Sequence, residues 1–234
     1  MKETIVRYLV SFLFTLPVIL LSLSVHELSH GFVSDKLGDH TARSMGRLTL
    51  NPLKHIDPIG FIALLVFHIG WARPVMVDAR NFKNPKRDMA LTALAGPVSN
   101  FLMAFVFSMV FAALLRFGGI NNSFFSILNY LNGTASEVSG ADVFGVITTL
   151  SYYFLVINIG LGVFNLISIP PLDGSKILYA FLPNRILFKI LPYERYLQFV
   201  LILLLWLGVL STPINYLVTL IYNGLLSLAT GVFF

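Results

Sequence analysis

The sequence predicts an all-α polytopic membrane protein with about five transmembrane helices around a three-helix core, a small cytoplasmic-side β-sheet and a re-entrant segment. The 234 residues are 56% hydrophobic and 12% charged, with a mean hydropathy of +0.81. Soluble domains usually carry about 25% charged residues. Apolar runs recur near the length of about 20 residues that a helix needs to cross a bilayer.

The first apolar segment runs from Ile5 to about Val33 and is long enough to cross with some tilt. A secretory signal peptide is the alternative, because Lys2 and Arg7 precede the apolar core. No convincing small-x-small cleavage site follows that core. We therefore expect a retained helix.

A polar stretch over residues 34–87 follows and holds nine Lys or Arg residues. Within it, "PIGFIALLVFHIG" (58–70) is too short to span, which favours a re-entrant or interfacial segment. The flanking "RLTLN" (47–51) and "RPVMVDA" (73–79) partly alternate between apolar and polar residues. This pattern predicts two short strands.

The remaining spans are predicted from apolar runs at about 88–117, 143–169, 196–210 and 214–230. Loop 118–142 has no Lys or Arg, whereas loop 170–195 carries four. Because basic residues accumulate on the cytoplasmic side, loops 34–87 and 170–195 are predicted inside and loop 118–142 outside. Five crossings then place the N-terminus outside and the C-terminus inside.

We expect residues 1–234 to form one membrane-embedded domain, with a core over about 5–180 and a C-terminal helical hairpin over about 196–230. The net charge of +5 is explained by this loop asymmetry, so no nucleic-acid partner is expected. The chain has no cysteine, which excludes disulfides and thiolate metal ligands.

The motif "HELSH" (26–30) lies at the end of the first apolar segment. In a helix, His26 and His30 lie on one face and reach one metal ion, and Glu27 is placed to hold a water on that metal. The alternative is a pair of polar helix-end residues facing the interface. That alternative is weakened because an ionisable residue costs about 2.5–3.5 kcal/mol at the membrane centre.

A catalytic zinc site needs a third protein ligand. The candidates are His40, His55, His68 and the carboxylates near the membrane, of which Asp173 is favoured. It follows Pro170 and Pro171, which end the helix, and precedes Gly174, which permits a tight approach. The alternative for Asp173 is an N-cap of the helix "DGSKIL".

These motifs resemble the site-2 proteases, which are intramembrane zinc metalloproteases. The family carries HExxH on one helix and Asn-x-x-Pro-x-Pro-x-x-Asp-Gly on another. The second motif matches at Asn165, Pro170, Asp173 and Gly174, and departs from the family at Ser168. The resemblance implies His26, His30 and Asp173 as zinc ligands, Glu27 as catalytic acid/base, and a compact bacterial-type member without a PDZ or CBS domain.

Two further residues are candidates for substrate or oxyanion contacts. Asn165 is positioned either to donate a hydrogen bond to the substrate or the developing oxyanion, or to act with Asn158, seven residues earlier on about the same face, as a polar contact to another helix. His55 either polarises the scissile carbonyl or blocks the metal, and its alternative is an interfacial polar turn. The same two alternatives apply to Asn100, for which the structural one is favoured. Gly96 is expected to allow close helix approach.

The sequence therefore predicts an intramembrane zinc metalloprotease that holds one zinc per chain. We expect it in the lipid bilayer of the bacterial cell membrane, with its active site near the cytoplasmic side and single-span membrane proteins as substrates. The alternatives are a polytopic metal transporter and a catalytically inactive protein that binds membrane helices. A transporter needs no general base, whereas the protease depends on Glu27.

Overall fold

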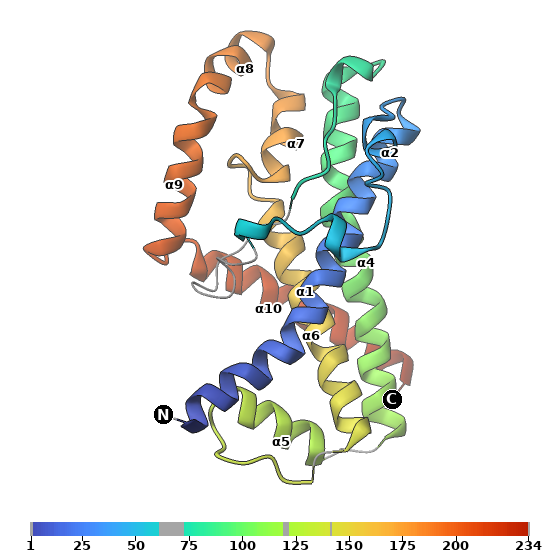
Figure 1. Ribbon diagram of the computed structural model, residues 1–234, viewed down its shortest axis with the longest axis vertical. Helices are drawn as coiled ribbons and strands as arrows, with labels where there is room; N and C mark the ends of the chain where they lie inside the picture. The colour runs from blue at the N-terminus through green and yellow to red at the C-terminus, as the bar shows by residue number, and fades with distance from the viewer. Residues whose placement is uncertain (1, 61–72, 119–121, 141, 234) are drawn as a thin grey trace. The chain divides into compact units, whose positions relative to one another are not determined.

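The computed structural model describes residues 2–60, 73–118, 122–140 and 142–233. Within these residues the secondary structure is helical (Figure 1). The longer helices are α1 (Lys2–Lys36), α4 (Pro85–Phe117), α6 (Val143–Asn165) and α10 (Ser211–Phe233). The shorter ones are α2 (Thr41–Ser44), α5 (Asn122–Leu131), α7 (Asp173–Phe181), α8 (Asn184–Ile190), α9 (Glu194–Trp206) and the 3₁₀ turns η1 (Pro52–Lys54), η2 (Ala79–Asn81) and η3 (Leu191–Tyr193).

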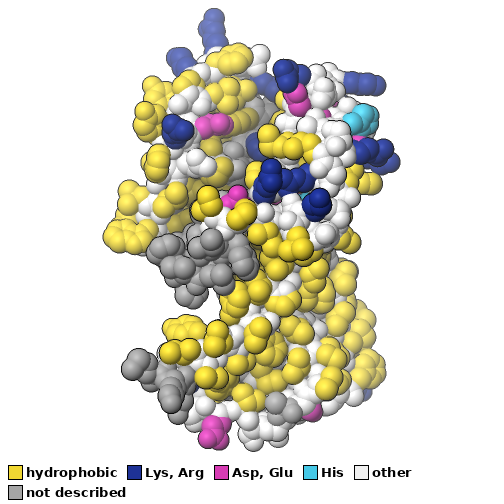
Figure 2. All heavy atoms as spheres, viewed as in Figure 1, with side chains coloured by type: hydrophobic (Ala, Val, Ile, Leu, Met, Phe, Trp, Pro, Cys, Tyr) yellow, Lys and Arg dark blue, Asp and Glu magenta, His cyan; other side chains and the backbone are white. Residues whose placement is uncertain are grey.

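Among the described residues, four helices are long and apolar enough to cross a membrane: α1 from Thr4, α4, α6 and α10. They correspond to four of the five predicted spans. Large apolar side chains lie at their surfaces, and apolar side chains cover much of the face shown in Figure 2. Lipid solvates such side chains, so this exposure agrees with an integral membrane protein.

The prediction of a fifth span at 196–210 is not confirmed. Helix α9 covers that region with 13 residues. At about 1.5 Å per residue it is about 20 Å long, which is shorter than a hydrocarbon core of about 30 Å. Four crossings would place both ends of the chain on the same side of the membrane.

The predicted strands at 47–51 and 73–79 are not found, and among the described residues only Ile56 forms a single bridge. The reason is visible in the backbone hydrogen bonds. Val75 N–H donates to Glu27 Oε2 at 2.8 Å, and Asp78 N–H donates to Asp39 Oδ2 at 2.9 Å. Segment 73–78 is therefore extended, and Arg73 N–H at its start donates to the backbone carbonyl of His55 at 2.7 Å, but Val75 and Asp78 are bonded to carboxylates instead of to a second strand. The predicted re-entrant segment 58–70 lies outside the described residues from position 61 onward.

The chain divides into two compact units, each built from separate stretches of sequence. The first comprises 1–22, 101–159 and 218–234. In it, Asn158 of α6 donates to Ser22 Oγ of α1 at 2.8 Å, and Phe107 of α4 stacks on Phe154 of α6. The interhelical role considered for Asn158 is therefore present, with Ser22 as its partner. That the chain is one domain stays a prediction.

The second unit comprises 23–100 and 160–217 and contains every candidate site residue. It holds the C-terminal part of α1, the N-terminal part of α4, the end of α6, and helices α7 to α9. Asp39 ties the turn after α1 to the extended segment, since it accepts from Thr41, Asp78 N–H and Asn81 Nδ2. This connection positions segment 73–78 next to Glu27.

Candidate metal centre

Helix α4 orients both histidines of the HELSH motif. His26 Nδ1 lies 2.6 Å from Asn100 Oδ1, and His30 Nδ1 lies 2.7 Å from the carbonyl oxygen of Thr92. Both partners are acceptors, so each Nδ1 carries the proton and each Nε2 presents a lone pair. Second-sphere bonds of this kind fix the tautomer and ring orientation of metal-binding histidines.

Asp173 completes a group of three ligand atoms. Its Oδ2 lies 3.1 Å from Nε2 of both His26 and His30, and the two Nε2 atoms are 3.0 Å apart. All three residues are buried. Asp173 is the first residue of α7 and Leu172 is the N-cap, with no side-chain cap bond. The N-cap alternative for Asp173 is therefore wrong.

The donor set fits a zinc ion. Two imidazole lone pairs and a carboxylate oxygen converge, and Asp173 Oδ2 is a buried atom without a hydrogen-bond partner. Three acceptors at such short range repel each other unless a cation lies between them. Ligands about 2.0–2.1 Å from one tetrahedral zinc ion lie roughly 3.3 Å from each other, which is close to the observed spacing.

Gly96 of α4 lies directly against the ligand atoms. A Cβ at this position would be 2.5 Å from His26 Cε1 and from His30 Nε2. Real Cβ atoms do not make contacts this short, so any side chain here displaces the imidazoles. The close helix approach that the sequence suggested for Gly96 therefore serves the metal centre.

The chain returns to the centre through a tight turn after α6. The Pro170–Pro171 peptide bond is cis. A Cβ at Gly174 would overlap the backbone carbonyl of Leu166. Glycine is thus needed for α7 to begin against the end of α6, and this contact brings Asp173 to the histidines.

Glu27 lies in a cavity of about 140 Å³ that is also lined by the three ligand residues. Its Oε2 accepts the Val75 N–H, so one oxygen is held by segment 73–78 and the other is available to a water molecule. Lys176 also lines the cavity, and its Nζ lies 4.0 Å from Asp173 Oδ1. The arrangement provides a carboxylate base and a cation beside a metal site.

Of the two further candidates, the structure brings one to this cavity. Asn165 lines it, and its Nδ2 donates to Leu161 O at 3.0 Å. His55 is buried elsewhere, with its Nε2 2.8 Å from the carbonyl oxygen of Thr49, and it does not line the cavity. The position of His55 fits the polar-turn interpretation.

Sequence reasoning missed the function of the α4 residues. Thr92, Gly96 and Asn100 recur every four residues and therefore share one helix face. This face pairs in antiparallel order with His26 and His30, since Asn100 meets the first and Thr92 meets the second. A small residue flanked by two polar ones at this spacing was the available signal.

Comparisons with known proteins agree with this geometry. Residues 14–208 match peptidase family M50. YwhC of Bacillus subtilis (strain 168), which is named as a candidate zinc metalloprotease, is 36% identical over 194 residues, covering 83% of this chain and 80% of its own length. Rip2 of Mycolicibacterium smegmatis, named in the same way, is 35% identical over 89 residues, covering 36% of this chain and 34% of its own length. The comparison with solved structures gives no significant match.

Proposed function

Because this chain belongs to peptidase family M50, the site-2 protease family, we propose that it is an intramembrane zinc metalloprotease that hydrolyses peptide bonds in or near transmembrane segments. One observation carries this function most directly. His26, His30 and Asp173 converge beside Glu27 in one cavity. The four apolar helices supply the membrane setting.

His26 Nε2, His30 Nε2 and Asp173 Oδ2 would hold one zinc ion per chain. A zinc ion held there supplies Lewis acidity, which lowers the pKa of a bound water toward about 7 and polarises a carbonyl oxygen. Glu27 accepts a proton from the attacking water and returns it to the leaving nitrogen as the C–N bond breaks. Val75 N–H keeps the Glu27 carboxylate facing this cavity throughout.

Asn165 and Lys176 are placed to stabilise charge on the substrate carbonyl oxygen. The Asn165 side chain has two N–H donors, and Leu161 O uses one of them. The second is available to the substrate. The Lys176 ammonium faces a cavity whose other charged groups are Glu27 and Asp173. Donors aimed at a developing oxyanion typically contribute about 2.7–4 kcal/mol.

We place the enzyme in the bacterial cell membrane with its active site near the cytoplasmic side. The loops at 34–87 and 170–195 carry most of the basic residues; the first follows the histidine end of α1, and the second contains α7. Single-span membrane proteins are the proposed substrates, because their helices reach this depth in the bilayer. The lipid bilayer is the only other partner that the proposal requires.

The test compares Glu27→Gln with the unchanged enzyme on a reconstituted single-span substrate. Glutamine keeps the size of glutamate but cannot accept the proton, so zinc stays bound while cleavage falls by about 10²–10⁴-fold. Elemental analysis and product mass spectrometry provide the two readouts. Cleavage near the original rate with zinc bound would refute the mechanism, and zinc flux into liposomes that survives the change would support a transporter instead.

A further inference from the structure

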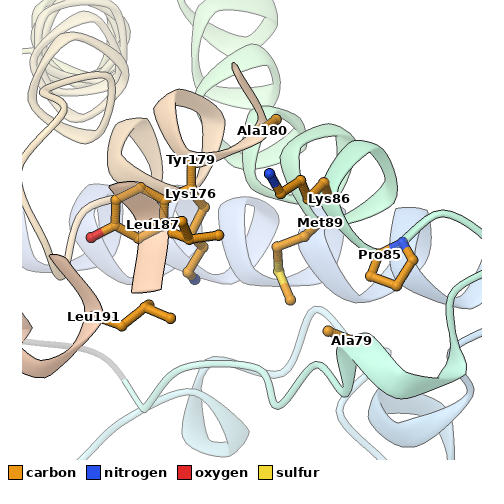
Figure 3. Close-up of a pocket in the computed structure, with 9 residues that line it drawn as sticks. All are labelled: Ala79, Pro85, Lys86, Met89, Lys176, Tyr179, Ala180, Leu187 and Leu191. Carbon is orange, nitrogen blue, oxygen red and sulfur yellow. The ribbon is translucent and has the colours of Figure 1, made fainter. Parts of the chain in front are cut away.

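We propose that a second, apolar cavity beside the metal centre binds a large apolar side chain of the substrate within two residues of the bond that is cut. The inference rests on the proposed protease function and adds a specificity site to it. The cavity has a volume of about 270 Å³ and lies among α4, α7 and α8 (Figure 3). Met89, Tyr179, Ala180 and Leu187 are among its lining residues.

The cavity is built to take an apolar group. Its exposed lining is apolar almost throughout. Its volume is about nine times the roughly 30 Å³ that one water molecule occupies in the liquid, so it accommodates a side chain. The Tyr179 phenol is neutral at physiological pH, and burial raises its pKa further, to about 12. Lys86 and Lys176 supply positive charge at the lining.

The two cavities share residues. Met89 and Lys176 line both the apolar cavity and the cavity of the metal centre. The extended segment also borders both, since Pro74, Val75 and Val77 line the metal cavity and Ala79 lines the apolar one. A substrate that lies along this segment with its carbonyl at the metal therefore continues past the apolar cavity.

The spacing fits a neighbouring side chain of the same peptide. One lysine side chain borders both cavities, so they are separated by about one or two residues of extended chain, each advancing about 3.3 Å. The Lys86 Nζ donates to Leu182 O at 2.6 Å and connects the start of α4 to the end of α7. The walls of the cavity are thereby held together before substrate arrives.

The discrimination expected from such a cavity is moderate. One methylene more or less in a hydrophobic pocket changes kcat/KM by about 10–200-fold. A substrate with leucine or phenylalanine at the matching position is therefore cut at least about tenfold more efficiently than one with alanine. Lysine is disfavoured further, because its charge meets Lys86 and Lys176.

The experiment scans one reconstituted single-span substrate with leucine, alanine and lysine at each position within two residues of the mapped cleavage site. Leu187→Trp fills the cavity from α8 and is expected to reverse the preference toward alanine. Ile186→Trp is the matched control, because Ile186 is 46% exposed and does not line the cavity. If Leu187→Trp keeps the side-chain preference of the unchanged enzyme, the subsite proposal is wrong. Cleavage by the unchanged enzyme would still support the proposed protease function.

A second readout does not depend on activity. In the Glu27→Gln enzyme, photo-leucine placed at successive substrate positions is expected to crosslink to α4, α7 or α8 at the preferred position. Crosslinks from the substrate to lipid alone overturn the proposal. If the unchanged enzyme cleaves no substrate, the proposed protease function is wrong. The crosslinks then test separately whether the apolar cavity binds the substrate side chain.

Discussion

At the residue scale, the candidate metal centre depends on the missing Cβ of Gly96 and on Oδ2 of Asp173. The three candidate ligands were proposed from sequence: the four-residue spacing of His26 and His30 implies a shared helix face, and the prolines before Asp173 imply a chain reversal. The spacing of Thr92, Gly96 and Asn100 was equally visible. Its role could not be inferred from residue types. Thr92 acts through its backbone carbonyl, which every residue has, and Gly96 has no side chain that would indicate a role.

We expect Asp173→Ala to lose most of its zinc. The substitution removes one of three protein ligands and leaves two imidazole lone pairs facing each other at 3.0 Å. Elemental analysis of purified protein measures the loss. Full retention of zinc in this variant would contradict the assignment of the third ligand, and His26→Ala provides the comparison for losing a ligand from α1.

We expect Gly96→Ala to lose zinc as well, although it changes no ligand. The added methyl would occupy the space of the His26 and His30 ring atoms, 2.5 Å away. Gly160→Ala is the matched control, since a Cβ there has no heavy atom within 4 Å. Equal zinc content in the two variants would show that α4 does not constrain the imidazoles.

At the scale of elements, the helices were predictable and the strands were not. Runs of apolar residues fix α1, α4, α6 and α10 because length and apolarity alone determine a span. Alternation at 73–79 predicted a strand, but Ala79 begins η2 and the extended backbone of residues 73–78 forms no strand. Alternation does not indicate its hydrogen-bond partner, which is supplied by Glu27 and Asp39 from positions more than thirty residues away.

Asp39→Ala is expected to loosen segment 73–78 while zinc is retained. It removes the acceptor of the half-buried Asp78 N–H and of the exposed Asn81 Nδ2. A buried donor left without a partner costs about 1–3 kcal/mol, so the loss of stability here is expected toward the lower end of that range. Because segment 73–78 also holds Glu27, cleavage is expected to fall. Glu137→Ala, at an exposed position in the other unit, is the control; equal thermal stability of both variants would contradict this role.

The same carboxylate predicts a pH dependence. Burial alone would raise the pKa of Asp39, but hydrogen bonds from Thr41, Asn81 and Asp78 lower it below its ordinary value. A lowered folded-state pKa stabilises the fold above the unfolded value of about 3.9, and this contribution is lost as the pH falls below it. The difference in free energy of unfolding between the unchanged protein and Asp39→Ala should therefore be smaller in acid than at neutral pH.

At the scale of the whole molecule, four of the five predicted spans correspond to described helices of spanning length, and the fifth is not confirmed. The run at 196–210 is apolar, but α9 ends at Trp206 and is too short to cross a bilayer. Composition cannot reveal this, because the apolar residues continue beyond the point where the helix ends. The charge asymmetry of the loops does not depend on that region and still predicts an orientation for α1, α4 and α6.

Cysteine labelling tests that orientation. In the cysteine-free chain, Ser136→Cys is expected to react with an impermeant thiol reagent from outside intact cells, and Asn84→Cys is not. The two positions lie in the loop without basic residues and in a basic loop, respectively. The reverse labelling pattern would invert the orientation and place the metal centre on the outer side.

The ligands come from distant stretches of chain, and this has a consequence for biosynthesis. His26 and His30 precede Asp173 by about 140 residues, which a ribosome adds over roughly 7–28 s at about 5–20 residues per second. During that interval the nascent chain has its histidines and its glutamate in the membrane without the aspartate. Proteolytic activity would therefore arise only late in translation. Until then, the nascent chain could not cleave the neighbouring proteins of the insertion machinery.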